Sequence, residues 1–466
     1  MDGACAITAA ACANLSNPEY TYVQASDVAP YFQIAKQYGY ANYMFQTNQG
    51  PSFPAHQFLL SGTSAPTDIS DSTVCHDSNG AAYPCYQWFA SENASHYQDP
   101  YGCTGQSTVV WGIAPSGLES SGYNSGYPCY NHNTLDTLLD NQSGPISWKY
   151  YAQAVHPATS LWTAPNAIPG ICGLSQDGKS CTGYDWLNNV KNVFPNSLTY
   201  PNGYSPILTD LGADPNQPQC TLPAVSWVVP DGNWSDHGGQ DPHGAGPSWV
   251  AAIVNAVGGF DNSGNQLATR CGYWANTVVL ITWDDWGGWY DHISPSAAAG
   301  GPGIGYPDGS GAKYVYGFRV PLLVVSAYNY RRQGATGYIS GACGPSQQFS
   351  CPNEKQQYIH DFGSILNFIE YVFGNGGNSI GEISPNYHYA DHFAPDAFPS
   401  CPKATCPYSL SDFFNFSGGP STFVPFTAQQ GITYTTQCFL TPKTQGCFGT
   451  NFTAADPDDD AIDQQN

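Results

Sequence analysis

The sequence predicts an α/β fold, a sandwich in which helices cover both faces of a mostly parallel sheet. Short, β-branched apolar runs alternate along the chain with amphipathic segments of helical period, which is the pattern of repeated strand-helix units. With 466 residues, the chain is long enough to bury a large core. Its 50 glycines and 37 prolines indicate many turns and long loops between these elements.

The first half of the chain contains the less regular elements. We expect a short helix over residues 28–37, a turn over residues 49–63, and a loop-rich, disulfide-tied insertion over residues 64–130, where Gly, Ser, Tyr, Pro and Cys accumulate. Leucines at helical spacing begin a helix at Leu135. The run at residues 146–152 then predicts a strand.

The second half alternates strands and helices more regularly. Apolar runs at residues 224–230, 278–283 and 320–328 have the length and composition of buried strands. Two amphipathic helices are expected at residues 246–259 and 361–373, because apolar side chains recur there every three to four residues.

The domain boundaries follow from this alternation. Residues 1–397 hold all the expected strands and helices and form one α/β domain. Residues 398–466 contain further Cys pairs and end in DPDDDAIDQQN, so we expect an irregular C-terminal wrap followed by a solvated acidic tail.

The charge balance excludes several kinds of partner. Only 12 Lys and Arg stand against 35 Asp and Glu, which gives a formal net charge of -23. A chain so acidic repels nucleic acid and anionic membrane surfaces, so we expect no nucleic-acid partner. The sequence contains no apolar run long enough for a transmembrane segment, and it carries no signal for an oligomeric state.

The cysteines indicate an oxidising compartment. There are 16, an even number, and their spacings do not match the short clusters of zinc sites. We expect local disulfides in a secreted, extracellular or periplasmic protein, with the connectivity open. Because Met1 is followed by Asp-Gly-Ala-Cys rather than by a signal peptide, an export signal is expected upstream of this sequence.

Residues 278–292, VVLITWDDWGGWYDH, combine a strand with a dense group of polar side chains. Asp284 and Asp285 follow the apolar run directly, and the carboxyl ends of strands in α/β sheets open onto the ligand crevice. Gly287 and Gly288 would let the chain turn both carboxylates toward one cation. The alternative is a solvated turn after a strand.

Six ordered sequence blocks along the chain, given at the end of this paragraph, resemble those of a known protein family. The family is the bacterial phosphoesterase family of non-haemolytic-type phospholipases C and secreted acid phosphatases, within the alkaline-phosphatase-like superfamily. The resemblance implies an alkaline-phosphatase-like α/β/α sandwich that hydrolyses phosphate esters, phospholipids or small phosphomonoesters, with one divalent metal beside a Ser or Thr nucleophile. The blocks are NQGPSFPAHQFLLSGT, NTLDTLLDNQSGPISWKYY, SDHGGQDPHGAGPSWVAAIVNAVGG, TVVLITWDDWGGWYDH, GFRVPLLVVSAY and HDFGSILNFIEYVFG.

The resemblance assigns the nucleophile and the metal ligands. Ser52, in GPSFP, matches the nucleophile, and Asp284 and Asp285 match the carboxylates that hold the metal. A hydroxyl is a weak nucleophile until it is activated, so Ser52 is also expected to be a metal ligand. Oxygen ligands suit Ca²⁺, Mg²⁺ or Mn²⁺, although the wider superfamily also uses Zn²⁺.

Histidines supply the remaining expected site residues. His237 and His292 match positions near the phosphoryl oxygens, where a histidine could neutralise charge or protonate the leaving group. His132 precedes a helix, so it either contacts the phosphate or caps that helix. We expect His56 and His360 to be structural or to support the site from behind.

One block of the family pattern is missing. Family members begin with a strand that ends in a Glu-Asn pair, whose side chains complete the metal and phosphate site. No such strand precedes Ser52, so we expect the chain to be truncated at its N-terminus relative to the family. Glu92 and Asn93 form the dipeptide, but they follow Ser52 and lack a preceding apolar strand, so we interpret them as a coincidence.

The main hypothesis is therefore a secreted, metal-dependent hydrolase of phosphate esters, of phospholipase C or acid phosphatase type, that uses Ser52. The alternative is a catalytically inactive secreted structural or surface protein that retains the fold. Glycoside hydrolysis by Asp284 and Asp285 is disfavoured, because adjacent acids seldom span the required separation of about 5 Å or more.

Overall fold

A computed structural model gives the fold of the chain. It describes residues 28–48, 52–66, 70–76, 82–86, 89–92, 101–113, 119–153, 161–193, 205–214, 218–230, 234–237, 245–261, 263–287, 291, 293, 295, 316–330, 337–340, 359–396 and 408–426.

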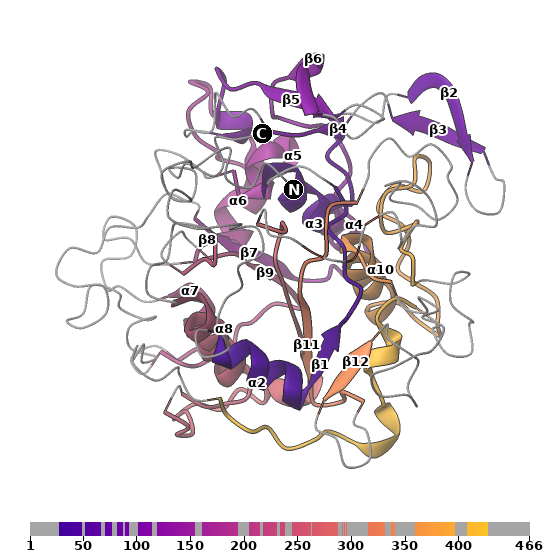
Figure 1. Ribbon diagram of the computed structural model, residues 1–466. Coiled ribbons are helices and arrows are strands. Elements are labelled where there is room, and N and C mark those ends of the chain that lie inside the picture. The colour runs from indigo at the N-terminus through magenta and orange to yellow at the C-terminus, as the bar shows by residue number, and fades with distance from the viewer. Residues whose placement is uncertain are drawn as a thin grey trace, which may run out of the picture.

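A four-stranded sheet lies at the centre of the molecule (Figure 1). Its strands, in spatial order, are β10 (Val278–Thr282), β11 (Leu322–Ser326), β1 (Gly39–Ala41) and β12 (Tyr338–Ser340). Strand β11 is antiparallel to both of its neighbours, whereas β12 runs parallel to β1. The sheet is therefore mixed.

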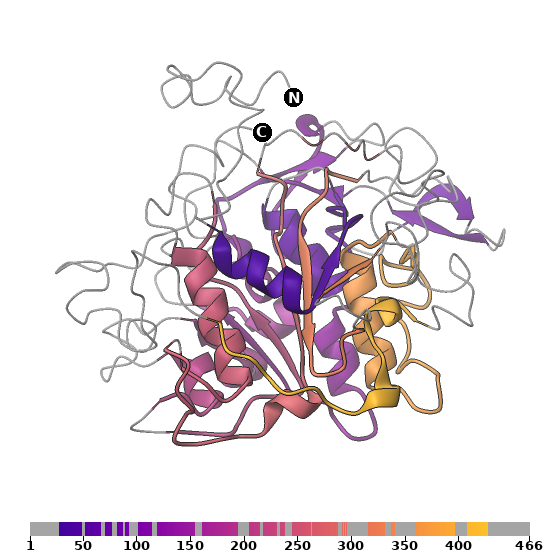
Figure 2. The same ribbon diagram turned by 60° about the horizontal axis from the view of Figure 1, so that its bottom comes forward.

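Helices cover both faces of this sheet. The four longest helices among the described residues are α2 (Ala29–Gln37), α3 (Ser52–Ser61), α8 (Ala245–Val257) and α10 (Phe362–Val372). Because side chains alternate along a strand, Leu322 and Val324 of β11 join the core cluster that contains α3 and α10, whereas Leu323 and Val325 join the cluster that contains α2 and α8. Figures 1 and 2 show α2 and α8 on one side of β11 and β1, and α10 on the other.

A second sheet has three parallel strands, in the order β8, β7, β9. Strand β7 is central, and the side chain of its Tyr150 is fully buried. The bounds are β7 Trp148–Ala152, β8 Val190–Asn192 and β9 Val225–Val228. The short helix α4 (Leu135–Asp140) precedes β7. Short helices also lie between the strands, namely α5 (Pro169–Cys172) and α6 (Tyr184–Asn189) between β7 and β8, and α7 (Pro206–Asp210) between β8 and β9.

The expected insertion over residues 64–130 contains two small antiparallel sheets, β2-β3 and β4-β5-β6. A disulfide between Cys103 and Cys129 closes its C-terminal part. The strands are β2 (Ser70–His76), β3 (Ala82–Tyr86), β4 (Phe89–Ala90), β5 (Val110–Ile113) and β6 (Glu119–Gly126). Single 3-10 turns lie at Gly102–Thr104, Ala164–Ala167, Tyr273–Asn276, Ser411–Phe413 and Phe416–Gly418.

The α/β class is confirmed, but the expectation of a mostly parallel sheet is wrong for the central sheet, where β10 and β11 are antiparallel. An apolar run marks a strand that is buried on both faces, and it carries no information about the direction of the neighbouring strand. The expected strands nevertheless formed at β7, β9, β10 and β11, and the expected helices at α2, α4, α8 and α10. The division at residue 397 and the alkaline-phosphatase-like topology stay predictions.

The expected turn over residues 49–63 is also wrong, because residues 52–61 form the helix α3. Pro54 is compatible with this helix because it lies in the first turn, where the backbone N–H has no intrahelical partner. Phe53, Phe58 and Leu60 are all buried, so packing stabilises α3 more than its local propensity does.

Among the described cysteines, none is free. Cys172 pairs with Cys181 nine positions along the chain, as expected of a local disulfide. Cys220 pairs with Cys271 across 51 positions, which spacing alone could not have predicted.

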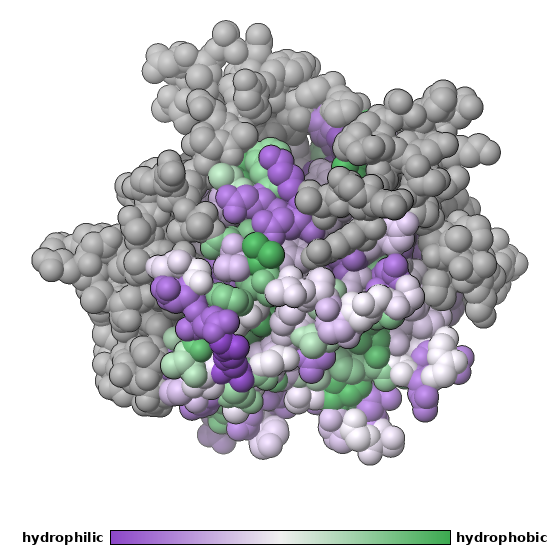
Figure 3. Space-filling model, turned by 90° about the horizontal axis from the view of Figure 1, so that it is seen from below, coloured by the Kyte–Doolittle hydropathy of each residue, from purple (hydrophilic) through white to green (hydrophobic). Residues whose placement is uncertain are grey.

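The described helices include none that combines the length and the apolar character needed to cross a bilayer. On the face seen in Figure 3, hydrophobic areas are separated by neutral and hydrophilic residues. Large apolar side chains that are well exposed are found in several elements, for example Leu187 in α6 and Phe416 near the C-terminal end of the described chain.

Candidate active site

Ser52 is the first residue of α3, and its side chain is completely buried. The helix is fixed beneath it by Phe53, which packs against Tyr101 and Tyr130 with ring centroids 4.8 and 5.8 Å away. The sequence therefore places a hydroxyl at the N-terminus of a buried helix, where partial positive charge from the backbone favours a bound anion.

Asp284 and Asp285 come just after β10, with only Trp283 between, and lie beside Ser52. The Ser52 Oγ atom is 3.5 Å from Asp285 Oδ2, although the two residues are 233 positions apart. The turn is held by Gly287, whose N–H donates to Asp285 Oδ1 over 2.6 Å. Gly287 has a positive φ of 65°, a conformation that favours glycine.

His56 supports this site from behind, in agreement with the structural or supporting position expected for it. Its Nε2 atom lies 3.4 Å from Asp284 Oδ2. The signal was available in the sequence, because residues four apart share one face of a helix, and His56 is four positions after Ser52. Its place on the same helix face as Ser52 was not foreseen, because residues 49–63 were interpreted as a turn.

His237 also contributes to the electrostatics of the site. Its ring lies 5.7 Å from that of Trp162, and Trp162 in turn lies 6.2 Å from His56. Burial alone would raise the pKa of Asp284, but the imidazole of His56, the hydroxyl of Ser52 and the charge of His237 hold that pKa well below its usual range. Asp284 is therefore ionised at any physiological pH.

Glu92 lies at the same helix terminus. Its Oε2 atom accepts a hydrogen bond of 2.5 Å from the backbone N–H of Phe53, and its side chain is only 2% exposed. A carboxylate at this position stabilises the N-terminus of α3. Glu92 therefore contacts the residue next to Ser52, whereas the interpretation of the Glu92-Asn93 dipeptide as a coincidental match to the family pattern stays a prediction. Asn93 lies outside the described residues.

The two other histidines expected at the site are His132 and His292. In the described part of the chain, no contact links either of them to Ser52. His132 donates from Nδ1 to Ala65 O over 2.7 Å and is buried between Tyr130 and Tyr389. Burial lowers the pKa of His132 to about 4, so this histidine is neutral. It does not cap α4, whose N-cap is Thr134. His292 lies outside the described residues.

The oxygen atoms at this site suit a hard divalent cation. Ser52, Asp284 and Asp285 supply one hydroxyl and two carboxylates, and Asp284 Oδ2 is a buried atom that accepts no well-formed hydrogen bond among the described residues. Oxygen ligands of this kind are preferred by Ca²⁺, Mg²⁺ and Mn²⁺. The residues present thus fit the expected metal.

Comparison with known proteins places the chain among phosphoesterases. The model of the Phosphoesterase family matches residues 13–375. The chain is similar to hemolytic phospholipase C of Pseudomonas aeruginosa, with 22% identity over 369 residues that cover 76% of this chain and 40% of that protein. It is also similar to phospholipase C B of Mycobacterium tuberculosis, with 32% identity over 195 residues that cover 40% of this chain and 32% of that protein.

A third relative is non-hemolytic phospholipase C of Burkholderia pseudomallei, which is 25% identical over 224 residues, or 41% of this chain and 30% of that protein. The chain thus spans less than half the length of each of these relatives. The family model, by contrast, covers most of the chain and includes Ser52, Asp284 and Asp285. The chain belongs to the Phosphoesterase family.

Proposed function

We propose that this chain is a metal-dependent hydrolase of phosphate esters, of phospholipase C or acid phosphatase type, in which Ser52 is the nucleophile. One observation carries the proposal. Ser52, a buried serine at a helix N-terminus, lies 3.5 Å from Asp285, one of two adjacent carboxylates, although 233 positions separate the two residues. Membership of the Phosphoesterase family and similarity to proteins named phospholipase C support the same reaction class.

In the proposed reaction, Ser52 Oγ attacks phosphorus and forms a new O–P bond, while the P–O bond to the leaving alcohol breaks. The alcohol leaves with a proton, and water then cleaves the phosphoserine to restore the hydroxyl. This second step releases phosphate when the substrate was a monoester, and a phosphomonoester when it was a diester. A divalent ion held by Ser52, Asp284 and Asp285 would supply charge neutralisation and favour the alkoxide form of the serine.

The protein's own residues position these groups. Asp284 stays ionised beside Ser52, and His56 holds its carboxylate in place. His237 is a candidate proton donor to the leaving alcohol and a candidate cation near the phosphoryl oxygens. His292 is proposed for the same role, and His132 for a substrate contact, on the resemblance alone. The chain has few Lys and Arg, so histidines are its main source of positive charge at the site.

We also propose that the protein works outside the cytoplasm. Its disulfides, for example Cys172 to Cys181 and Cys220 to Cys271, form and persist in oxidising compartments.

Removal of divalent metal is expected to reduce hydrolysis of a chromogenic phosphomonoester and of phosphatidylcholine at least about 100-fold. Charge stabilisation by a metal is worth several kcal/mol, and each 1.36 kcal/mol is a factor of ten in rate. The measurement is the rate before and after chelation, and then after addition of Ca²⁺, Mg²⁺, Mn²⁺ or Zn²⁺ in turn. A chromogenic glycoside serves as the control substrate. No turnover of either ester with any of the four ions would favour the catalytically inactive alternative.

Replacement of His56 by alanine is expected to lower kcat about 10- to 100-fold, the usual effect of removing a group that orients a metal-binding carboxylate. H56Q should recover part of this loss, because glutamine can still donate a hydrogen bond toward Asp284. Equal rates in H56A and the wild type would show that His56 has no positioning role.

A further inference from the structure

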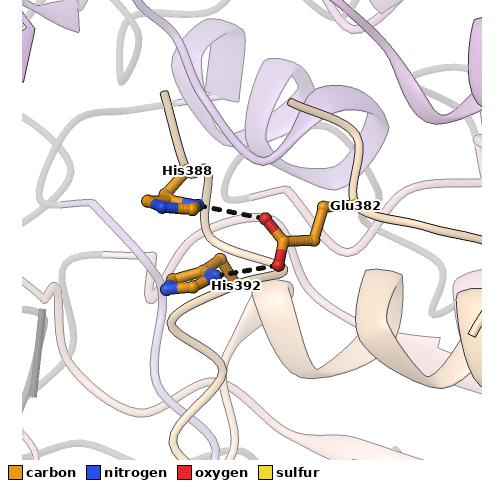
Figure 4. A group of neighbouring side chains, drawn as sticks. All are labelled: Glu382, His388 and His392. Atoms are coloured by element: carbon orange, nitrogen blue, oxygen red, sulfur yellow. Dashed lines mark hydrogen bonds and ion pairs between the residues drawn. The ribbon is translucent and has the colours of Figure 1, made fainter. Parts of the chain in front are cut away.

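Three side chains outside the active site converge after α10. Glu382, His388 and His392 point toward one another from a loop in the C-terminal third of the chain (Figure 4). The Nδ1 atom of His388 lies 3.0 Å from Glu382 Oε2, and the Nδ1 atom of His392 lies 3.1 Å from Glu382 Oε1. The ligand atoms of all three residues lie within 4.8 Å of one another.

The backbone of the loop produces this convergence. His388 has a positive φ of 55°, which is uncommon for a residue other than glycine. Its N–H donates to Ser384 O over 2.9 Å, and the N–H of His392 donates to Tyr389 O over 3.1 Å. As a result the two imidazole rings stack, with centroids 3.7 Å apart and planes 21° from parallel. Both rings present the same nitrogen to one carboxylate.

Two imidazoles and one carboxylate are a set of ligands that transition metals bind, and His₂Glu is an established ligand set for zinc. Zn–N and Zn–O bonds of about 2.0 to 2.1 Å place neighbouring atoms of a tetrahedral site about 3.3 to 3.4 Å apart. The observed separations of 3.0 and 3.1 Å need only a few tenths of an ångström of adjustment. The site is therefore close to the required geometry before a metal enters.

The surroundings let a cation enter. Glu382 accepts from Nδ1 of both histidines, one through each carboxylate oxygen, and a metal would replace these two hydrogen bonds as each histidine loses its Nδ1 proton. The ligand side chains themselves are 20 to 35% exposed, which leaves access for an ion and for a water as fourth ligand.

We propose that Glu382, His388 and His392 form a second metal site, which binds a divalent transition ion of zinc type and is distinct from the site at Ser52. Its role is structural. The same loop packs against the C-terminal end of α3, where Ala390 N donates to Gly62 O over 3.0 Å. The backbone N–H of Asn133 donates to the hydroxyl of Tyr389 over 3.4 Å. A metal would fix this loop against the helix whose first residue is Ser52.

The test measures zinc binding by the full chain, from which metal has first been removed by chelation and dialysis. It uses a D284N/D285N background, so that the carboxylates of the proposed catalytic site cannot contribute. This background should bind one zinc ion per chain. Addition of E382Q, which preserves size and hydrogen bonding, should weaken zinc binding at least about 100-fold, and so should H388Q/H392Q in the same background. N386A, which changes an exposed residue of the same loop, is the matched control and should bind zinc normally.

Thermal unfolding provides a second measurement. Zinc should raise the unfolding midpoint of the background chain and of N386A, because a ligand that binds only the folded state stabilises it. It should leave the midpoints of E382Q and H388Q/H392Q unchanged. The proposal is overturned if the background chain binds no zinc, or if the folded E382Q and H388Q/H392Q variants bind zinc as tightly as the background does.

Discussion

Replacement of Ser52 by alanine is expected to reduce hydrolysis of phosphate esters at least about 10³-fold, because the reaction loses the nucleophile that lies beside Asp285. The fold should survive. The side chain of Ser52 is buried, but its contact with Asp285 is long, at 3.5 Å, so loss of the hydroxyl should change the free energy of unfolding by about 1 kcal/mol or less. The measurements are kcat/KM and a urea unfolding curve for each variant.

Ser61 provides a matched control for this experiment. It is on the same helix and is equally buried, but it lies at the opposite end of α3 from Ser52. S61A should therefore retain the wild-type rate within a factor of about two to three, while its stability changes by a similar small amount. Mass spectrometry of quenched wild-type reactions should find the phosphoryl group on the peptide that contains Ser52. Turnover by S52A at the rate of S61A would remove Ser52 from the mechanism.

The structure shows why some elements could be predicted and others could not. The strand β10 and the helix α10 are specified locally, by a β-branched run and by a 3.6-residue period with Asp361 as a capping residue. The antiparallel pairing of β10 with β11 depends on a partner about 40 positions away, which no local pattern encodes. The helix α3 was missed because its stability comes from burial rather than from amphipathic periodicity.

The candidate site divides in the same way. Ser52 and the Asp284-Asp285 pair were expected from motifs, and the fold brings them to within hydrogen-bonding range. His56 and Glu92 reach the site only because α3 is a helix and because the chain returns to the N-terminus of that helix. Glu382, His388 and His392 were not singled out, since their spacing matches no short zinc motif and the left-handed backbone of His388 is not visible in the sequence.

A buried ion pair between His360 and Asp396 is expected to be a main determinant of stability. His360 Nδ1 lies 2.7 Å from Asp396 Oδ2, and His360 Nε2 lies 2.7 Å from Ser340 Oγ. The arrangement has the connectivity of a Ser-His-Asp triad, but all three side chains are 0 to 2% exposed, so no substrate reaches the serine. The burial of His360 matches the structural position expected for it. Ser340, His360 and Asp396 are therefore part of the core.

The pH dependence follows from the pKa shifts in this core. Burial lowers the pKa of His360, but the charges of Asp396, Asp412 and Asp361 raise it more, so the net shift is upward. Its contribution to stability is complete below its unfolded pKa of about 6.5 and is lost as pH rises through the folded value. Burial raises the pKa of Asp361 to about 7, which acts in the same direction. The folded chain should therefore be more stable at pH 6 than at pH 8.5.

D396N is expected to reduce the free energy of unfolding by about 3 to 5 kcal/mol at pH 6, because it leaves the imidazolium of His360 buried without its counter-ion. The amide oxygen can still accept from the N–H of Leu410, and the amide nitrogen, in place of Asp396 Oδ1, can donate to Ser364 Oγ, so the loss reports mainly on charge. Without Asp396 the pKa of His360 should fall, and the decline in stability between pH 6 and pH 8.5 should become smaller. D177N, at an exposed aspartate, should unfold at the wild-type urea concentration. An unchanged midpoint and an unchanged pH profile in D396N would contradict the proposed ion pair, since a neutral hydrogen bond would tolerate the amide.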